Sequence, residues 1–424
     1  MPIDTVMAVR RLLLDLRRRA QTNILKRLRR SRLFPRTLVD RQGDDDRLGD
    51  ARTDAAVMVY FPGALDTLYQ ITPWLPTFEA LHAVHRVLVV CQDSRVAAEL
   101  RAACGLPVLT VARYGTLDGF LARSDVKLAL YVSHLPRNFE NLRFTSLLHA
   151  YIGHGDSDKG VSASNQLKAY DFVFAPGQAA VDRIARRLMQ FDAAARCVIV
   201  GQPLTLAAPD ESTPPVGRPV VLYAPTWEGA QPSVAYSSVL THGEGLVRAL
   251  LADGRFDVLY RPHPLIGVTS RSYAVADQAI RALVEAAGGG SAVVLADDEP
   301  LKQSFARSSV LLCDVSAVAT AWLPSLKPLV VTEPSGPESV AADSGMLSAV
   351  PRLSAADANR APAVLAAELE DDSGRARREQ LVAYYLSPYW PDRVQERFIE
   401  ACGDAIRLRD EQRARLLSGG ATGV

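Results

Sequence analysis

The feature that most constrains the fold of this chain is an alternation of short apolar runs with longer stretches of helical periodicity. In the first half, the apolar runs cover residues 57–60, 86–91, 127–132, 172–175 and 197–200, and the helical stretches lie near 76–84, 93–103, 138–147 and 177–190. Runs this short are typical of strands that are buried on both faces, and the intervening helices are the crossovers that parallel strands require. We predict a parallel sheet covered by helices.

The same alternation returns after a proline-rich segment at residues 203–219. The second set of apolar runs covers residues 220–224, 256–260, 292–295, 309–312 and 328–331. We therefore predict an α/β protein with two doubly wound, Rossmann-like domains that face a cleft, the first at 55–203 and the second at 219–390. The charged segment 391–424 is expected to form a helix that packs back on the first domain.

The first 41 residues hold twelve Lys or Arg against three Asp, with apolar residues at helical spacing among them. This pattern is typical of a basic amphipathic helix that lies on an anionic membrane surface. The alternatives are a helix docked on its own protein and a nucleic-acid-binding arm, and the scarcity of aromatic residues argues against nucleic acid. Residues 42–54 are polar and predict a linker.

Composition limits the environment of the chain. Its 424 residues are 48% hydrophobic and 22% charged, as in soluble globular proteins, and no stretch approaches the roughly 20 apolar residues that span a bilayer. The five cysteines are scattered without a closely spaced pair, which favours a reducing compartment and argues against structural zinc. With no signal-peptide pattern, these features predict a peripheral protein at the cytoplasmic face of the cell membrane.

Polar groups follow four apolar segments, of which one, 147–152, is additional to the runs above. They are His154 after 147–152, Pro225-Thr226-Trp227-Glu228 after 221–224, Arg261-Pro262-His263-Pro264 after 258–260, and Asp314-Val315-Ser316 after 310–313. Ligands of open parallel sheets bind beyond the carboxyl ends of the strands. We therefore expect the four groups to line one cleft between the domains.

Three of the groups suit an anionic substrate, and each of the three also has a structural alternative. His154 can accept a proton near neutral pH and Lys159 can meet an anion, although this loop can also be a simple polar turn. Arg261 and His263 flank a proline that stiffens them for anion binding, and the alternative is a histidine hydrogen-bonded inside its own loop. Ser316 opens a predicted helix, where it can act as the N-cap, bind phosphate or do both.

The order and wording of these groups resemble the CDP-glycerol glycerophosphotransferases of teichoic acid synthesis, which are two-domain GT-B enzymes. The family signatures HGTxxK, YAPTWR, RPHP and DYSS correspond here to His154-Gly155-Asp156-Ser157-Asp158-Lys159, Tyr223-Ala224-Pro225-Thr226-Trp227-Glu228, Arg261-Pro262-His263-Pro264 and Asp314-Val315-Ser316-Ala317. The resemblance covers roughly residues 140–335 and includes 326–331, which is similar to the family's strand after the last signature. It implies the GT-B fold, a nucleotide-activated donor and a glycan or lipid-linked acceptor.

The resemblance also implies roles for individual residues. His154 would be the general base that removes the proton of an acceptor hydroxyl, whose oxygen attacks the phosphate that bears the glycerol of CDP-glycerol. His263 would be the second catalytic residue, and with Arg261 and Ser316 it would stabilise the pyrophosphate and the leaving CMP through positioning and electrostatics. Asp314 and Thr226 would also belong to the donor-phosphate site, and Lys159 would meet an anionic group of the donor or the acceptor. CDP-glycerol would be a substrate, and neither a cofactor nor a metal is implied.

Four residues depart from the family pattern: Asp156, Glu228, Ala317 and Ala321. Asp156 and Asp158 are expected to lie on the acceptor side. We expect the added carboxylates Asp156 and Glu228 to favour the protonated form of His154 and to repel an anionic acceptor, which predicts a neutral sugar hydroxyl as the acceptor. The alternatives are a GT-B glycosyltransferase that uses a nucleotide sugar and a binding protein with this fold and no turnover.

Overall fold

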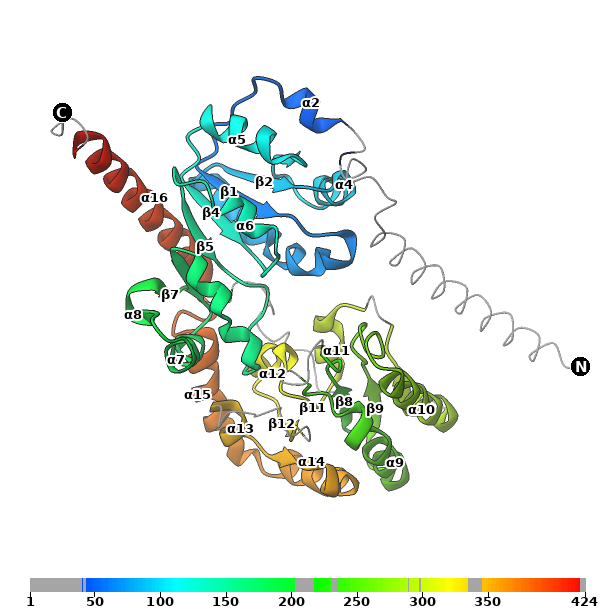
Figure 1. Cartoon of the computed structure of the whole chain (residues 1–424). Helices are drawn as coiled ribbons and strands as arrows, with labels where there is room; N and C mark the ends of the chain where they lie inside the picture. The colour runs from blue at the N-terminus through cyan, green and yellow to red at the C-terminus, as the bar shows by residue number, and fades with distance from the viewer. Residues whose placement is uncertain are drawn as a thin grey trace, which may run out of the picture.

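A computed structural model of the chain shows two α/β units, one above the other in Figure 1. The structure describes residue 40 and residues 43–202, 217–229, 235–288, 290–296, 299–334 and 345–419. Apart from Asp40, the predicted membrane-surface helix at 1–41 lies outside these residues. Within the described ranges, no helix is both long enough and apolar enough to cross a membrane.

The first unit is built on a parallel sheet of seven strands. In spatial order they are β3 (Val108–Thr110), β2 (Val87–Cys91), β1 (Val57–Phe61), β4 (Leu128–Tyr131), β5 (Leu148–Tyr151), β6 (Phe172–Ala175) and β7 (Cys197–Ile199). Between them lie α2 (Asp44–Leu48), η2 (Leu65–Gln70), η3 (Thr72–Trp74), α3 (Leu75–Val84), α4 (Ser94–Ala103), α5 (Tyr114–Ala122), α6 (Asn138–Asn141), η4 (Gly160–Ala163), η5 (Asn165–Ala169), α7 (Gln178–Arg187) and α8 (Ala193–Arg196). The chain starts near the centre of the sheet, fills one edge and then returns to fill the other, which is a doubly wound topology.

The second unit repeats this plan with six parallel strands. In spatial order they are β10 (Ala292–Val294), β9 (Asp257–Tyr260), β8 (Val220–Ala224), β11 (Val310–Cys313), β12 (Leu329–Thr332) and β13 (Arg352–Leu353). Its helical segments are η7 (Val239–Gly243), α9 (Glu244–Asp253), α10 (Arg271–Ala287), α11 (Leu301–Arg307), α12 (Ala317–Trp322), η8 (Leu323–Ser325), α13 (Gly345–Ala349), η9 (Ala355–Arg360), α14 (Ala361–Glu370), η10 (Asp372–Gly374) and α15 (Arg375–Leu386). The two parallel sheets confirm the predicted fold class.

Both faces of the central strands are buried, which explains their almost continuous apolar sequences. In β1, Val57, Val59 and Phe61 belong to one core cluster, whereas Met58 and Tyr60 belong to the cluster on the opposite face. All five side chains are at most 1% exposed. Burying an apolar side chain of this size contributes about 1.5–3 kcal/mol, so the strand sequence itself determines that helices cover both faces.

Several elements differ from the sequence prediction, among them α2, which lies within the predicted linker at 42–54, and α5, which the predicted helical stretches do not include. The edge strands β3 and β13 were not predicted, because runs of three and two residues do not stand out as apolar periodicity. The helix predicted at 138–147 is limited to α6. The residues between α6 and β5, 142–147, form turns instead of continuing the helix.

The C-terminal helix α16 (Val394–Gly419) returns to the first unit, as Figure 1 shows. Its apolar face is formed by Phe398, Ala401, Cys402, Ala405 and Ile406, which belong to the core cluster on one face of the first sheet. This helix therefore completes a core whose strands lie more than 190 residues earlier in the chain.

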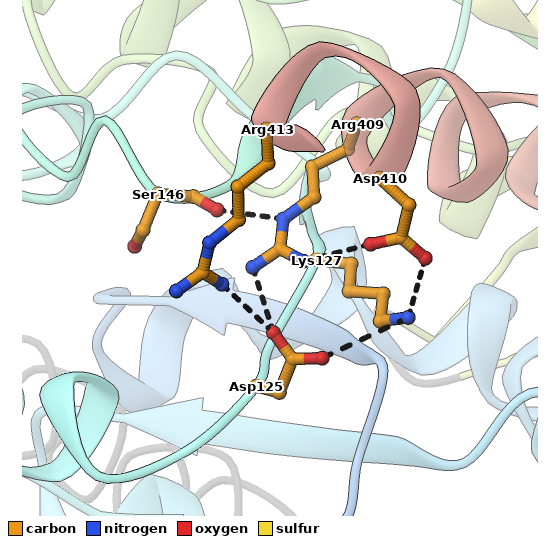
Figure 2. Close-up of polar contacts among 6 residues, drawn as sticks. All are labelled: Asp125, Lys127, Ser146, Arg409, Asp410 and Arg413. Atoms are coloured by element: carbon orange, nitrogen blue, oxygen red, sulfur yellow. Dashed lines mark hydrogen bonds and ion pairs between the residues drawn. The ribbon is translucent and has the colours of Figure 1, made fainter. Parts of the chain in front are cut away.

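Ion pairs fasten α16 to the amino ends of β4 and β5 (Figure 2). Arg409, with a side chain only 6% exposed, donates from Nη2 to Asp125 Oδ1 (2.8 Å) and from Nε to the carbonyl oxygen of Ser146 (2.8 Å). Lys127 Nζ bonds Asp410 Oδ2 at 2.5 Å. These contacts leave the opposite, carboxyl ends of the strands open to the second unit.

Candidate active site

A cavity of about 510 Å³ lies between the two units, at the carboxyl ends of their strands. The predicted site residues that line it are His154, Asp156, Lys159, Thr226, His263 and Ser316. The first three follow β5 of the first unit, and the others follow β8, β9 and β11 of the second unit. The structure therefore brings residues from all four sequence signatures together in one cavity.

His154 presents an unprotonated ring nitrogen for chemistry. Its Nδ1 lies 3.0 Å from the carbonyl oxygen of Val132, which can only accept, so Nδ1 carries the proton and Nε2 has a free lone pair. Gly153, at φ 70°, turns the chain just before it, and Trp74 Nε1 donates to the Gly153 carbonyl oxygen (2.8 Å). The surrounding protein lowers the pKa of His154 by desolvation, although the bond to Val132 opposes the shift. His154 is therefore neutral at pH 7 and can accept a proton.

His263 has the opposite tautomer. The backbone N–H of Leu265 donates to its Nδ1 (3.1 Å), so in the neutral ring the proton is on Nε2. The Trp227 ring stacks on the imidazole, with 6.3 Å between the ring centroids. Burial lowers the pKa of His263 to about 4, and the nearby charge of Lys159 adds to the shift. His263 is therefore a neutral hydrogen-bond donor at pH 7.

Lys159 connects the two units across the cavity. Its Nζ donates to Thr226 Oγ1 (2.8 Å), and the backbone N–H of Thr226 in turn donates to Asp314 Oδ2 (2.7 Å). Burial lowers the pKa of Lys159 to about 8, although Asp314 opposes the shift. In the part of the chain that the structure describes, Lys159 forms no ion pair with a carboxylate. A half-buried ammonium without a carboxylate partner favours an anionic ligand.

Ser316 lies directly before α12, but its side chain makes no capping hydrogen bond. Its Oγ is buried and has no partner among the described residues. Because an unsatisfied buried hydroxyl costs stability, Ser316 Oγ is available to a ligand in the cavity. The neighbouring Ala317 packs close to the His154 loop: a Cβ on Gly155 would lie 3.4 Å from Ala317 Cβ.

Arg261 and Asp314 do not line the cavity. Arg261 donates from Nη1 to Ser304 Oγ (3.0 Å) and from Nη2 to the carbonyl oxygen of Glu299 (2.8 Å). Asp314 is fully buried, and besides Thr226 it accepts the hydroxyl of Thr332 (2.6 Å). The geometry gives both residues a positioning role inside the second unit, in place of the predicted direct contact with phosphate.

Asp156 and Asp158 share one buried guanidinium. Arg183 of α7 donates from Nη2 to Asp156 Oδ1 and from Nη1 to Asp158 Oδ1 (2.9 Å). The hydroxyl of Tyr385, from α15 of the second unit, donates to Asp158 Oδ2 (2.6 Å). All four side chains are buried. This network fixes the loop between His154 and Lys159, and it ties that loop to the second unit.

Glu228 stabilises the loop that follows His263. Its Oε1 accepts the backbone N–H groups of Thr269 (2.9 Å) and Ser270 (3.1 Å), and its Oε2 accepts that of Gly267 (3.0 Å). Burial raises the pKa of Glu228, but these hydrogen bonds outweigh burial and hold the pKa below its ordinary value. Glu228 is thus ionised, stabilises the loop after His263 and does not line the cavity.

The expected effect of the added carboxylates on His154 is wrong. The pKa of His154 is lowered, mainly by desolvation, and not raised. Asp156 is compensated by Arg183, and Glu228 is compensated by backbone N–H groups, so neither provides an unscreened negative charge next to the base. Repulsion from these two residues therefore gives no reason to expect a neutral acceptor.

Several cavity residues were not predicted from the sequence. They include Tyr69, Gln70, Trp74, Ser133, His134, Tyr151 and Gln202, all from the first unit. Tyr69 and Gln70 are part of η2, just after β1, and Ser133 and His134 follow β4. The rule used for the other strands, that functional residues follow their carboxyl ends, would have found these four as well.

Comparison with known proteins identifies the fold. No family model matches the chain, and no curated protein matches it. A glycosyltransferase from Rickettsia africae ESF-5 is 12% identical, with a TM-score of 0.55 over 84% of this chain and 99% of that chain. A variant of the wall teichoic acid polymerase TagF is 13% identical, with a TM-score of 0.53 over 94% of this chain and 99% of that chain.

The S. aureus MnaA–UDP complex is 13% identical, with a TM-score of 0.52 over 82% of this chain and 95% of that chain. The chain has a GT-B fold. At such low identities the similarity extends to the fold alone, and the function must be argued from the cavity residues.

Proposed function

We propose that this protein is a transferase that moves glycerol phosphate, or a related polyol or sugar phosphate, from a CDP-activated donor to a hydroxyl of a glycan or lipid-linked acceptor. The observation that carries the proposal is a pair of complementary histidines in one cavity, one from each unit. His154 offers a free lone pair on Nε2, and His263 offers an N–H on Nε2. A hydroxyl nucleophile requires a base, and a phosphate leaving group requires hydrogen-bond donors.

The proposed reaction follows from these roles. His154 Nε2 takes the proton of the acceptor hydroxyl, and the oxygen attacks the phosphorus that bears the glycerol. The bond between this phosphorus and the bridging oxygen of the pyrophosphate breaks, and CMP leaves with the electron pair. The product is a phosphodiester between acceptor and glycerol. No covalent intermediate with the protein is needed.

On the donor side, three groups suit the pyrophosphate. Lys159 supplies a positive charge, Ser316 Oγ supplies a hydroxyl without a protein partner, and His263 donates from Nε2. Because the cavity holds them away from bulk water, each interaction with the developing negative charge is stronger than it would be in water. Asp314 and Arg261 support this wall from behind.

The sequence signatures and the fold support the proposal from separate directions. The signatures resemble those of CDP-glycerol glycerophosphotransferases, and the structures with a similar fold include TagF soaked with CDPG and MnaA with UDP. We also propose that residues 1–41 hold the protein on the anionic cytoplasmic surface of the cell membrane, where a lipid-linked acceptor is within reach.

A donor screen tests the proposed function. The full-length protein is incubated with membranes of its source and with CDP-glycerol, CDP-ribitol, or UDP-linked sugars, and the released nucleotide and the product linkage are identified by mass spectrometry. We expect release of CMP and formation of a phosphodiester. Release of UDP with formation of a glycosidic bond would replace the proposal with nucleotide-sugar glycosyl transfer.

A further inference from the structure

The wall of the cavity next to His154 contains hydrogen-bonding atoms that have no protein partner. Gln70 Oε1, His134 Nδ1 and Asp156 Oδ2 are buried and unpartnered among the described residues, and all three residues line the cavity. Gln70 is only 9% exposed. Leaving a buried polar atom unsatisfied costs about 1–3 kcal/mol, so several of them in one wall indicate a ligand with hydroxyl groups.

The same wall presents an exposed aromatic ring. Tyr69 is 57% exposed and meets the His154 imidazole edge-on, with 5.9 Å between the ring centroids. Its hydroxyl accepts a hydrogen bond from Gln70 Nε2 (3.3 Å), which connects the ring to one of the unpartnered groups. Behind this wall, the ring of His134 stacks on Tyr151 at 4.1 Å. An exposed tyrosine beside a base provides a flat apolar surface for a ring.

Among the described residues, no cationic side chain of the first unit other than Lys159 lines the cavity. Among the described residues that line the cavity, the charged side chains are Asp156 and Lys159. Asp156 is paired with Arg183, and Lys159 donates to Thr226 of the second unit. With Lys159 assigned to the donor pyrophosphate, a second phosphate group, on the acceptor, would therefore lose its hydration without gaining a cation of its own, which is unfavourable.

We propose that Tyr69, Gln70 and His134 form an acceptor subsite for a neutral, hydroxyl-rich ring, the terminal sugar of a glycan. The ring stacks on Tyr69, its hydroxyls bond Gln70 Oε1 and His134, and one further hydroxyl meets His154 Nε2. The inference rests on the proposed function in taking this wall as the acceptor side. The inference does not depend on repulsion of an anionic acceptor by Asp156 and Glu228. It predicts that a poly(glycerol phosphate) end is not the preferred acceptor.

Binding without turnover tests this subsite. Saturation-transfer NMR on the full-length protein, in the presence of CMP, measures affinities for the methyl glycosides of glucose, galactose and N-acetylglucosamine and for glycerol 3-phosphate. The variants are Tyr69→Ala and Gln70→Leu. The matched control is Leu65→Ala, because Leu65 is an exposed apolar residue of the same segment η2 and does not line the cavity.

We expect at least one neutral glycoside to bind more tightly than glycerol 3-phosphate. Tyr69→Ala and Gln70→Leu should each weaken it about fivefold to tenfold, whereas Leu65→Ala should leave it unchanged. The affinity for CMP should be the same in all variants, which shows that they are folded. Tighter binding of glycerol 3-phosphate, no binding of any neutral glycoside, or equal affinities in all variants would overturn the subsite. If the subsite is overturned but CMP is still released when a glycerophosphate primer is the acceptor, the proposed function stands. If a sugar binds but no donor is turned over, the subsite stands and the proposed function fails.

Discussion

Replacing Arg183 with methionine tests whether its ion pairs hold the loop between His154 and Lys159. The side chains of Arg183, Asp156 and Asp158 are 5%, 9% and 7% exposed. In Arg183→Met, both carboxylates stay buried without this cation. Removing one partner of a buried ion pair costs about 3–5 kcal/mol. Asp158 keeps its bond from Tyr385, so we expect a loss of about 3 kcal/mol in the free energy of unfolding.

The pH dependence of this loss has a definite sign. Burial already raises the pKa of Asp156, and Arg183 opposes that shift. Without Arg183 the folded-state pKa rises further above the value in the unfolded chain, so protonation stabilises the folded variant. Its deficit relative to the wild-type protein should therefore be smaller at about pH 5 than at about pH 8.

Urea unfolding followed by circular dichroism measures both effects. The matched control is Arg187→Met, which removes the same charge from an exposed position of the same helix α7 and should change stability by less than about 0.5 kcal/mol. An Arg183→Met variant that is no less stable than Arg187→Met, or whose deficit grows as the pH falls, would refute the role given to this network.

Three further predictions concern the cavity. Lys159 has a pKa of about 8 and loses its charge above that pH, so CDP-glycerol should bind less tightly as the pH rises above about 8. Calorimetry should find that Lys159→Met abolishes this pH dependence and that the exposed control Lys302→Met keeps it. Ser316→Ala loses no hydrogen bond to a described residue, so it should change the free energy of unfolding by less than about 0.5 kcal/mol. It should weaken CMP binding about threefold to tenfold, and an unaltered CMP affinity would show that Ser316 is not part of the donor site. The rate should fall with decreasing pH only below the ordinary pKa of histidine, because desolvation lowers the pKa of His154; a kcat/KM profile with its acidic limb above that value would contradict the assignment.

The fold could be predicted because the central strands have continuous apolar sequences, which indicate burial on both faces. Val57 and Met58 point to opposite faces of the first sheet and are both fully buried, which requires an apolar sequence without alternation. The edge strand β13, with two residues, carries no such pattern, and its position depends on pairing with β12. The sequence pattern therefore predicted the longer strands and missed β3 and β13, which are too short to show it even though Val108 and Leu353 are buried in the core.

The candidate site was predictable in its residues more than in its chemistry. His154 and His263 were found because both follow strands at their carboxyl ends, but their tautomers depend on Val132 and Leu265, whose hydrogen bonds appear only in the folded chain. Arg261 is two residues from His263, yet its guanidinium bonds groups about 40 residues further along the chain, so its neighbours in sequence do not indicate its direction.

The charge balance of the cavity could not be predicted from the sequence motifs either. Asp156 suggested an unscreened carboxylate beside the base, whereas its partner Arg183 lies on α7, 27 positions later. A short motif can thus show which groups are present, but the partner that neutralises them comes from packing. The same holds for Glu228, whose partners are backbone N–H groups of a loop about 40 residues away.

The central claim is that His154 is the base for transfer from a CDP-activated donor. It is tested most directly by the acceptor-dependent release of CMP from CDP-glycerol, measured for the wild-type protein and for His154→Ala at matched concentration. We predict that the wild-type protein releases CMP in the presence of a glycan acceptor, and that His154→Ala is slower by about 10²–10⁴-fold with unchanged CMP affinity. CMP release by His154→Ala at the wild-type rate would contradict the account.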